Sequence, residues 1–212
     1  MIGVSRKLFI IWMLCLQICL TNNIYAQEKI DSLLVFVGEK INVTELPGFH
    51  NNGFIYDYAF KAKYKVIQII NGQYGLDTIE FEVYDHNGHP PFAEYTNVLL
   101  YLIKGNNGKW YHEKYMYSDV YRTMNGRWAG SYAFADYNHE FNKATSIKPQ
   151  KISFTEKVSY DLKGMSKETI EKWFPKPYYK IKDQRAYIKK GNYINELFLL
   201  KKNGFLKARG YF

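Results

Sequence analysis

The chain has 212 residues, 18% of them aromatic, and its 29 lysines and arginines outnumber its 20 aspartates and glutamates, which gives a formal charge of +9. Both of its cysteines, Cys15 and Cys19, lie in a segment that we expect to be removed, so the mature protein is predicted to contain no thiol. That excludes disulfide bridges, thiolate metal sites and cysteine nucleophiles. The aromatic content favours β-structure, because rings bury large areas and pack well on pleated sheets.

Residues 1–26 have the pattern of a secretory signal peptide. Two cations precede an apolar run over residues 8–20, and a short polar stretch then leads to Ala26. The run has 13 residues, whereas a helix needs about 20 to span a bilayer. We therefore expect cleavage near Ala26, export to the periplasm or beyond, and no membrane span in the mature chain. Lipid anchoring at Cys19 is not expected, because Ile18 stands where that processing requires a small side chain.

The predicted mature chain, residues 27–212, keeps 27 basic and 20 acidic side chains, a net charge of +7. A basic surface of this kind attracts anionic glycans, lipid headgroups or nucleic acid. Because export separates the protein from nucleic acid, we expect no nucleic-acid partner. A protein or glycan at the cell envelope is the kind of partner that fits, and its identity stays open.

The first elements of the mature chain are predicted to be strands. The apolar run over residues 33–37 predicts a strand buried on both faces, and Gly38 after it predicts a bend or bulge. Apolar and charged residues alternate over residues 61–66 and again over residues 78–83, which predicts two strands that each have one solvated face. The turn residues over 71–76 then predict a hairpin between them.

The alternation also predicts which side chains of this hairpin meet. The apolar positions are even-numbered in the first strand and odd-numbered in the second, so we expect Val66 to face Phe81 and Lys65 to face Glu82. The lysines of the first strand would then be partly neutralised by glutamates rather than form a binding stripe.

Two more strands follow. Residues 97–105 form another continuous apolar run, which predicts a central strand, and residues 110–122 predict the strand that returns after a tight turn. We therefore place a first β domain over residues 27–123. The polar, irregular residues 124–150 are expected to be a linker or seam, and residues 151–212 a C-terminal α+β extension.

Four elements are predicted within or near that extension. Residues 151–160 alternate weakly, as one strand would. Ser166 is a suitable N-cap for a helix that stops before Pro175. Residues 191–204 predict a second helix closed by the Asn-Gly step at its end. The last eight residues, 205–212, are expected to form an edge strand.

Three stretches in the first half resemble the netrin-like family, which includes the tissue inhibitors of metalloproteinases and is built on an OB-type β-barrel. They are LLVFVGEKINV, YKVIQIINGQYGLDTIEFEVY and NVLLYLIKGNNGKWY, which begin at residues 33, 64 and 97. In members of this family, an apolar strand leads to a Val-Phe-x-Gly sequence, and a later strand carries the main apolar segment. The resemblance covers less than half of the mature chain.

The resemblance implies a mainly β protein, α+β overall, with an OB-type closed or partly open barrel and a C-terminal α+β extension. Inhibitors of that family chelate the protease zinc through a free N-terminal cysteine and brace the barrel with disulfides. Here the predicted N-terminus is Gln27 and no cysteine survives, so protease inhibition is not carried over. The chain also resembles a group of small exported bacterial proteins without assigned activity, which implies location and fold only.

The stretch YDHNGHPPF, residues 84–92, holds the first candidate site. Asp85, His86 and His89 lie within five residues of one another, and His112 can join them as a distal ligand. Histidine and carboxylate ligands suit zinc, so a metal-assisted hydrolase is one alternative function. The dense turn residues favour a rigid turn between strands instead, and we expect no cofactor.

Aromatic residues provide the second candidate site. Trp110, Tyr115 and Trp128 belong to a ring-rich stretch that can form a stacking surface, and OB-type barrels bind sugars on one sheet face. The competing interpretation is that alternate rings fill the barrel. A carbohydrate-binding surface requires these rings to be exposed and in a row.

Evidence for catalysis in the sequence is weak. Glu94, Glu113 and Asp119 can supply a carboxylate pair for glycoside hydrolysis, but the sequence does not set the separation on which that mechanism depends. No nucleophile motif accompanies them. The leading hypothesis is therefore a non-catalytic binding or interaction protein of the cell envelope.

Overall fold

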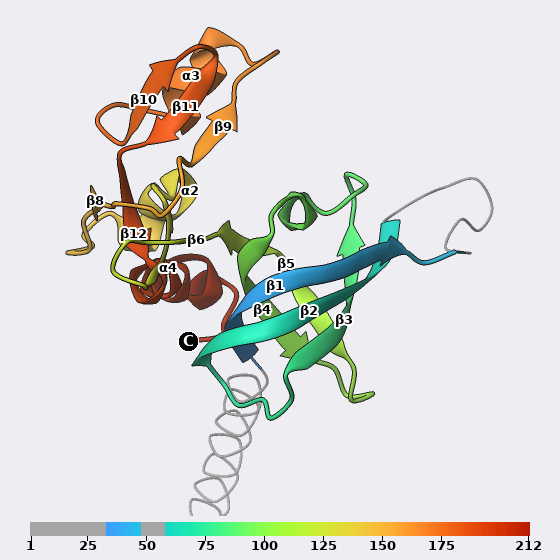
Figure 1. The fold of residues 1–212 in the computed structure, drawn as a ribbon. Helices are drawn as coiled ribbons and strands as arrows, with labels where there is room; N and C mark the ends of the chain where they lie inside the picture. The colour runs from blue at the N-terminus through green and yellow to red at the C-terminus, as the bar shows by residue number, and fades with distance from the viewer. Residues whose placement is uncertain (1–32, 48–57) are drawn as a thin grey trace, which may run out of the picture.

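The computed structural model describes residues 33–47 and 58–212, so the predicted signal peptide and the predicted N-terminus lie outside the described residues. The protein is mainly β, with a barrel and a C-terminal part that carries a few short helices (Figure 1). None of the helices in these described ranges is long and apolar enough to cross a membrane.

Five strands close into a barrel in the order β1–β2–β3–β5–β4. They are β1 (Leu33–Glu45), β2 (Tyr58–Asn71), β3 (Thr78–Asp85), β4 (Asn97–Lys104) and β5 (Trp110–Asp119). All neighbours are antiparallel except β3 and β5, which pair in parallel. This closed, mixed barrel is compatible with an OB-type barrel and confirms the predicted fold class. A short helix, η1 (Pro91–Glu94), connects β3 to β4 and places Phe92 in the barrel interior.

In the hairpin of β2 and β3, the apolar side chains point into the barrel as predicted, but the residues that lie opposite one another differ from the predicted pairs. Ala62, not Val66, faces Phe81, and Lys61 faces Glu82. The predicted register is wrong because the last residues of β2 extend past β3 and pair with β1 instead, where the Asn71 side chain donates to Leu33 O at 2.8 Å. The exposed lysines of β2 are nevertheless partly neutralised by glutamate, since Glu80 Oε2 lies 2.7 Å from Lys61 Nζ.

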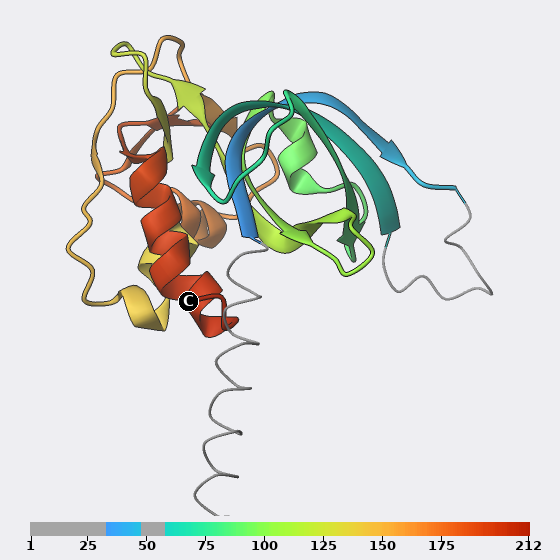
Figure 2. The same cartoon turned by 90° about the horizontal axis from the view of Figure 1, so that it is seen from below.

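Strand β1 is buried on both faces over residues 33–37, as predicted. Its even-numbered side chains point into the barrel, and its odd-numbered side chains join a second core with β4 and the helix α4 (Ile194–Lys201). Figure 2 looks into the barrel, with α4 running beside its wall. The side chains that form this second core from the outer faces of β1 and β4 are Leu33, Val35, Val37, Leu99 and Tyr101.

The C-terminal part contains two small sheets and several short helical segments. One sheet has the order β6–β7–β12–β8 and the other the order β10–β11–β9. The strands are β6 (Tyr121–Arg122), β7 (Trp128–Ser131), β8 (Gln150–Lys151), β9 (Ser159–Asp161), β10 (Tyr179–Lys182), β11 (Arg185–Ile188) and β12 (Lys190–Tyr193). The helical segments are α2 (Phe134–Tyr137), η2 (Glu140–Asn142), α3 (Lys167–Trp173), α4, and η3 (Lys202–Leu206).

Residues 124–150, predicted as a seam, contain β7 and α2. Strand β7 lies against the end of β5, because a Cβ atom on Gly130 would come within 2.7 Å of Asp119 O. Only a residue without a side chain allows two backbones to approach this closely. The barrel and the C-terminal part therefore meet through direct backbone packing as well as through the second core.

The predicted helix α3 is confirmed: Ser166 is its N-cap, and its side chain accepts a hydrogen bond from Thr169 N. Residues 151–160 are not one strand, since β8 and β9 belong to different sheets. The predicted stop at residues 203–204 and the edge strand at 205–212 are also wrong, because the helical chain continues through η3. Gly204 is there for close packing: a Cβ at this position would lie 2.8 Å from Asn142 Nδ2.

Replacing Gly38 by valine should lower the free energy of unfolding by about 1–3 kcal/mol, the usual cost of overpacking. This glycine lies at an irregularity in the pairing of β1 with β2, as predicted, and a Cβ there would be 2.9 Å from Phe36 Cε2 and 3.0 Å from Tyr64 Cδ1. Both rings are fully buried, so neither has room to move. Urea denaturation measures the change.

The matched control is Gly75→Val, because nothing lies within 4 Å of a Cβ at Gly75. It should change the free energy of unfolding by less than about 0.5 kcal/mol. Equal losses in the two variants would contradict the close packing of Gly38.

Candidate functional site

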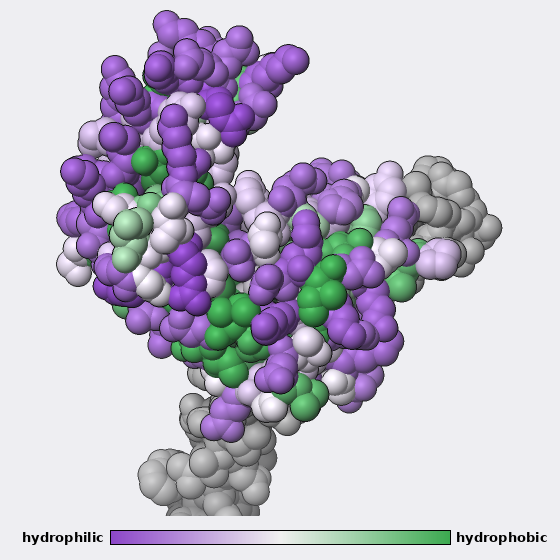
Figure 3. Space-filling model, in the orientation of Figure 1, coloured by the Kyte–Doolittle hydropathy of each residue, from purple (hydrophilic) through white to green (hydrophobic). Residues whose placement is uncertain are grey.

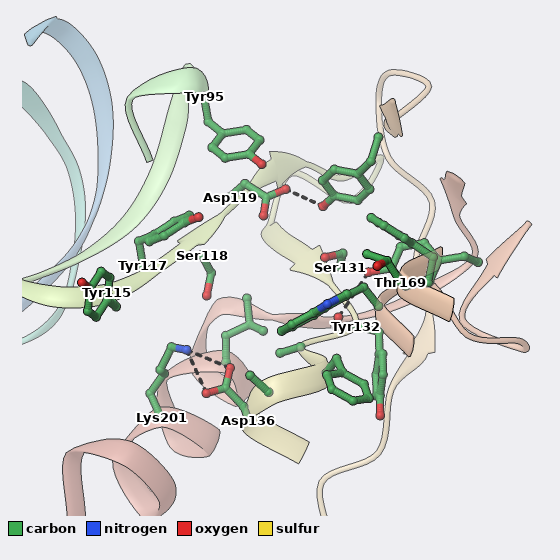
Figure 4. A pocket seen from close by; sticks show the side chains of 18 of the residues that line it. Tyr95, Tyr115, Tyr117, Ser118, Asp119, Ser131, Tyr132, Asp136, Thr169 and Lys201 are labelled. Atoms are coloured by element: carbon green, nitrogen blue, oxygen red, sulfur yellow. Dashed lines mark hydrogen bonds and ion pairs between the residues drawn. The ribbon is translucent and has the colours of Figure 1, made fainter. Parts of the chain in front are cut away.

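The surface is hollowed between the barrel and the part of the chain that carries α3 (Figure 3). A cleft of about 570 Å³ lies there, lined by side chains from β5, β7, α2, α3 and α4 (Figure 4). Aromatic side chains make up nearly half of the lining residues. Its tyrosines are Tyr95, Tyr115, Tyr117, Tyr132, Tyr160 and Tyr179.

Asp119, the last residue of β5, supplies the main polar group of the cleft wall. Tyr160 donates a hydrogen bond to its Oδ2 at 2.6 Å. Burial raises the pKa of the Asp119 carboxyl above its ordinary value, although the hydroxyl groups of Tyr160 and Tyr121 favour the charged form. No cationic side chain in the described ranges forms an ion pair with it. The carboxylate thus has hydrogen-bond partners but no counter-charge in this part of the chain.

A second carboxylate of the cleft is already neutralised. Lys201 Nζ lies 2.8 and 3.0 Å from the two carboxylate oxygens of Asp136, and both side chains are buried. A buried pair of this kind holds α2 to α4, and removing one partner would leave an uncompensated charge in the interior. Asp136 therefore has a structural role here.

Tyr115 stands at the edge of the cleft in an unusual backbone conformation. Its φ is 66°, in the left-handed region that residues with a side chain rarely adopt, and its side chain is half exposed. It lies in a bulge of β5, where the residues between His112 and Tyr117 lie opposite a single residue of β4, Tyr101. Bulges re-aim side chains, and this one directs a ring to the cleft.

The bulge is fixed by the C-terminal tail. Glu113 is buried within it and accepts hydrogen bonds from Arg209 and from the Tyr211 hydroxyl, the latter at 2.6 Å. Arg209 also donates to Lys114 O at 3.0 Å. Strained residues persist only where the surrounding structure holds them, and here the tail of the chain holds Tyr115.

Stacked rings make the opposite wall of the cleft rigid. Tyr132 stacks on Tyr178 with ring centroids 3.8 Å apart and on Tyr137 with centroids 5.0 Å apart. Tyr179 donates a hydrogen bond from its hydroxyl to Tyr132 O at 3.2 Å. Nearby, Trp173 packs edge-on against Phe134 and leaves 43% of its surface exposed. Ring stacking and this hydrogen bond thus hold the aromatic surface of the wall in place.

The residues of the predicted metal site go to different environments. Asp85 is buried and accepts a hydrogen bond from Asn87 N at 2.8 Å, as in a turn. His86 is exposed in that turn, whereas His89 packs edge-on against Phe60. Across the described ranges, no group of three or more histidine, cysteine, aspartate or glutamate side chains is placed to hold a metal ion.

His112 belongs to the barrel end rather than to that turn. Its ring lies 4.6 Å from the ring of Phe92, centroid to centroid, and its Nε2 donates to Met116 O at 3.0 Å. Burial lowers the pKa of His112 to about 4, so the ring is neutral at physiological pH. The hydrogen bond to Met116 helps to shape the bulge that carries Tyr115.

The three predicted surface rings are not in one row. Trp128 is buried beneath Arg122, whose guanidinium carbon lies 4.1 Å from the ring centroid. Trp110 packs edge-on against Tyr74 on the barrel. Of the three, Tyr115 alone lines the cleft. The aromatic surface that the protein does have is built from other tyrosines.

Of the three candidate carboxylates for glycoside hydrolysis, Asp119 lines the cleft, while Glu113 holds the tail. Glu94 lies 3.8 Å from His89 at an exposed position. Tyr132, Tyr160 and Asp136 could not be identified from sequence patterns, because they lie in segments that only the fold brings beside β5. The high number of tyrosines was the one signal that pointed to such a surface.

Comparisons of the chain with protein-family models, with curated proteins and with solved structures found no match. The function therefore has to be inferred from the cleft and the surface of this chain alone.

Replacing His112 by glutamine should remove part of the acid sensitivity of the protein. The His112 ring has a pKa near 6.5 in the unfolded chain and of about 4 in the folded chain. Between these pH values the unfolded state binds more protons than the folded state does. The free energy of unfolding therefore falls as the pH is lowered from 6.5 to about 4. The loss amounts to about 3 kcal/mol for the wild type.

Urea denaturation at pH 7 and at pH 4.5 measures this difference in both proteins. The His112→Gln variant should lose less free energy of unfolding between the two pH values than the wild type does. His89→Gln, which leaves His112 in place, is the control. An unchanged pH dependence in His112→Gln would contradict a neutral, buried His112.

Proposed function

We propose that the protein is an exported, non-catalytic binding protein of the cell envelope and that the tyrosine-lined cleft holds its ligand. The observation that carries this proposal is Tyr115, a half-exposed ring held at the cleft in a left-handed conformation by a bulge and a buried carboxylate. A barrel alone does not need this arrangement. A binding site does, because a fixed ring costs little entropy when a ligand stacks on it.

The polar groups of the cleft favour binding over hydrolysis. A glycosidase of the usual kind needs two carboxyl groups that flank the scissile bond. In the cleft, Asp119 has no cationic partner in the described ranges, whereas Asp136 is ion-paired with Lys201. The alternative of a metal-assisted hydrolase at residues 85–112 has no support from the described residues.

The lining fits a neutral saccharide best. The carbohydrate ligand is therefore proposed for the tyrosine-lined cleft instead of for a row of the three predicted rings. Sugars present apolar C–H faces to aromatic rings and hydroxyl groups to hydrogen-bond acceptors. Tyr115 and Tyr132 supply rings, and Asp119 supplies the acceptor. We infer that the ligand is a sugar chain or another compact molecule with both kinds of surface.

The netrin-like kinship and the export of the protein are parts of the same proposal. They rest on the strand motifs and on the signal-peptide pattern of the sequence, and a closed five-stranded barrel agrees with the kinship. Protease inhibition is not part of it, because the predicted N-terminus lacks the cysteine that such inhibitors use.

The proposal is tested by titrating the mature protein with neutral cello-, malto-, xylo- and chito-oligosaccharides and following tryptophan fluorescence. Trp173 lines the cleft and should report binding. Tyr115→Ala should weaken the affinity by about tenfold, since one aromatic contact contributes about 0.5–1.5 kcal/mol beyond its buried area. Asp119→Asn should weaken it as well, through the lost charge on the acceptor.

Phe141→Ala is the matched control, because Phe141 is 51% exposed, as Tyr115 is 50% exposed, and does not line the cleft. Thermal unfolding checks that each variant is folded. Binding that is unaffected by Tyr115→Ala and Asp119→Asn, or the absence of binding to every probe, would contradict the proposal. Release of shorter sugars from a probe would identify an enzyme instead.

A further inference from the structure

The positive charge of the protein is concentrated in its C-terminal third. Residues 143–212 contain 17 lysines and arginines and 6 aspartates and glutamates, a net charge of +11. The barrel region, residues 33–123, contains 8 basic and 10 acidic residues, a net charge of −2. A charge difference of this size between two parts of one chain indicates a surface that attracts anions.

Two neighbouring grooves collect these lysines. The larger, of about 730 Å³, is lined by Lys151, Lys176, Lys180, Lys189 and Lys190. The smaller, of about 380 Å³, shares Lys180 and Lys189 with it and adds Lys157 and Lys182. We call them the lysine grooves. Hydrophilic side chains dominate the surface over β9, β10 and β11 (Figure 3).

The lysines of the larger groove lack carboxylate partners. None of the five forms an ion pair with a carboxylate in the described ranges. The lysines of β2 are different, because Lys61 and Lys63 both reach Glu80, at 2.7 and 3.2 Å. Like charges held close together repel one another, and a bound anion relieves that repulsion. The larger groove therefore has an unused capacity for negative charge, whereas in the smaller one Glu156 lies in the lining and Lys182 pairs with Asp183 at 3.7 Å.

The floor of the larger groove is apolar. Pro177, Tyr179 and Ile181 lie between the lysines, and Ile181 is 43% exposed. A ligand that fits must combine spaced negative charges with apolar ring faces. Several lysines along two connected grooves match a chain with repeated charges better than a single phosphate group.

We propose that the lysine grooves bind an acidic polysaccharide, a chain of sugars that bears carboxylate or sulfate groups. Single-stranded nucleic acid fits less well, because it uses exposed rings for base stacking and Tyr179 is only 5% exposed. A flat bilayer fits less well because the apolar floor is recessed between lysines. Tyr179 borders both this groove and the tyrosine-lined cleft, but none of the groove lysines lines the cleft, so the proposal does not depend on the function proposed for the cleft.

The test uses a fluorescently labelled oligouronate and a sulfated dextran, with neutral dextran as the uncharged comparison. Fluorescence anisotropy at increasing sodium chloride measures the affinity of the mature protein. The two acidic chains should bind, and salt should weaken both. The double variant Lys180→Gln/Lys189→Gln, which alters the lysines common to both grooves, should lower the affinity by about tenfold or more.

The matched control is Lys61→Gln/Lys65→Gln, which changes the net charge equally on the exposed face of β2. It should change the affinity by less than about twofold, and all four lysines are surface residues whose replacement leaves the fold intact. Equal losses in the two double variants would overturn the proposal, because binding would then follow net charge alone.

Tighter binding to a single-stranded oligonucleotide, or to vesicles that contain phosphatidylglycerol, would also overturn the proposal in favour of those partners. Tyr115→Ala should leave the affinity for the acidic chains unchanged. The test therefore separates failure of the lysine grooves from failure of the tyrosine-lined cleft.

Discussion

The outer faces of β1 and β4 are as apolar as their inner faces, and the rest of the structure depends on covering them. Side chains such as Val35, Leu99 and Tyr101 are fully buried outside the barrel, against α4. The aliphatic side chains Val35 and Leu99 each contribute about 1.5–3 kcal/mol when they are removed from water. A barrel with this face open to solvent would expose a large hydrophobic patch, so the C-terminal part is needed to complete the core.

The tyrosine-lined cleft and the charge distribution follow from that packing. Because α4 covers one side of the barrel and Gly130 brings β7 to the end of β5, the remaining gap between the two parts is open and lined by rings. Glu113 fixes its edge by holding the tail to the bulge of β5. The lysines of the larger groove lie farther out, where none of the described carboxylates forms an ion pair with them. One chain thus separates the tyrosine-lined cleft from a basic surface.

Periodicity in the sequence predicted the elements that local patterns determine. The double burial of residues 33–37, the facing of β2 and β3, and the N-cap Ser166 were all correct, since each depends on residues close in sequence. The hairpin register and the role of Gly204 were wrong because distant partners, Leu33 and Asn142, decide them. The cleft could not be predicted, because Tyr115, Tyr132 and Asp119 come together only through the packing of α4 and β7 on the barrel.

Coincident unfolding of the two parts is the most direct test that a shared core joins them. Trp110 reports on the barrel, and Trp128 lies in the core between barrel and α4. Two variants are made in which one of these tryptophans is kept and all others are phenylalanine. Their urea unfolding curves, followed by fluorescence and referred to far-UV circular dichroism of the same sample, should each show one transition that coincides with the loss of all secondary structure. A Trp110 signal that stays native after Trp128 has become exposed would show that the barrel is stable alone, and it would contradict the shared core.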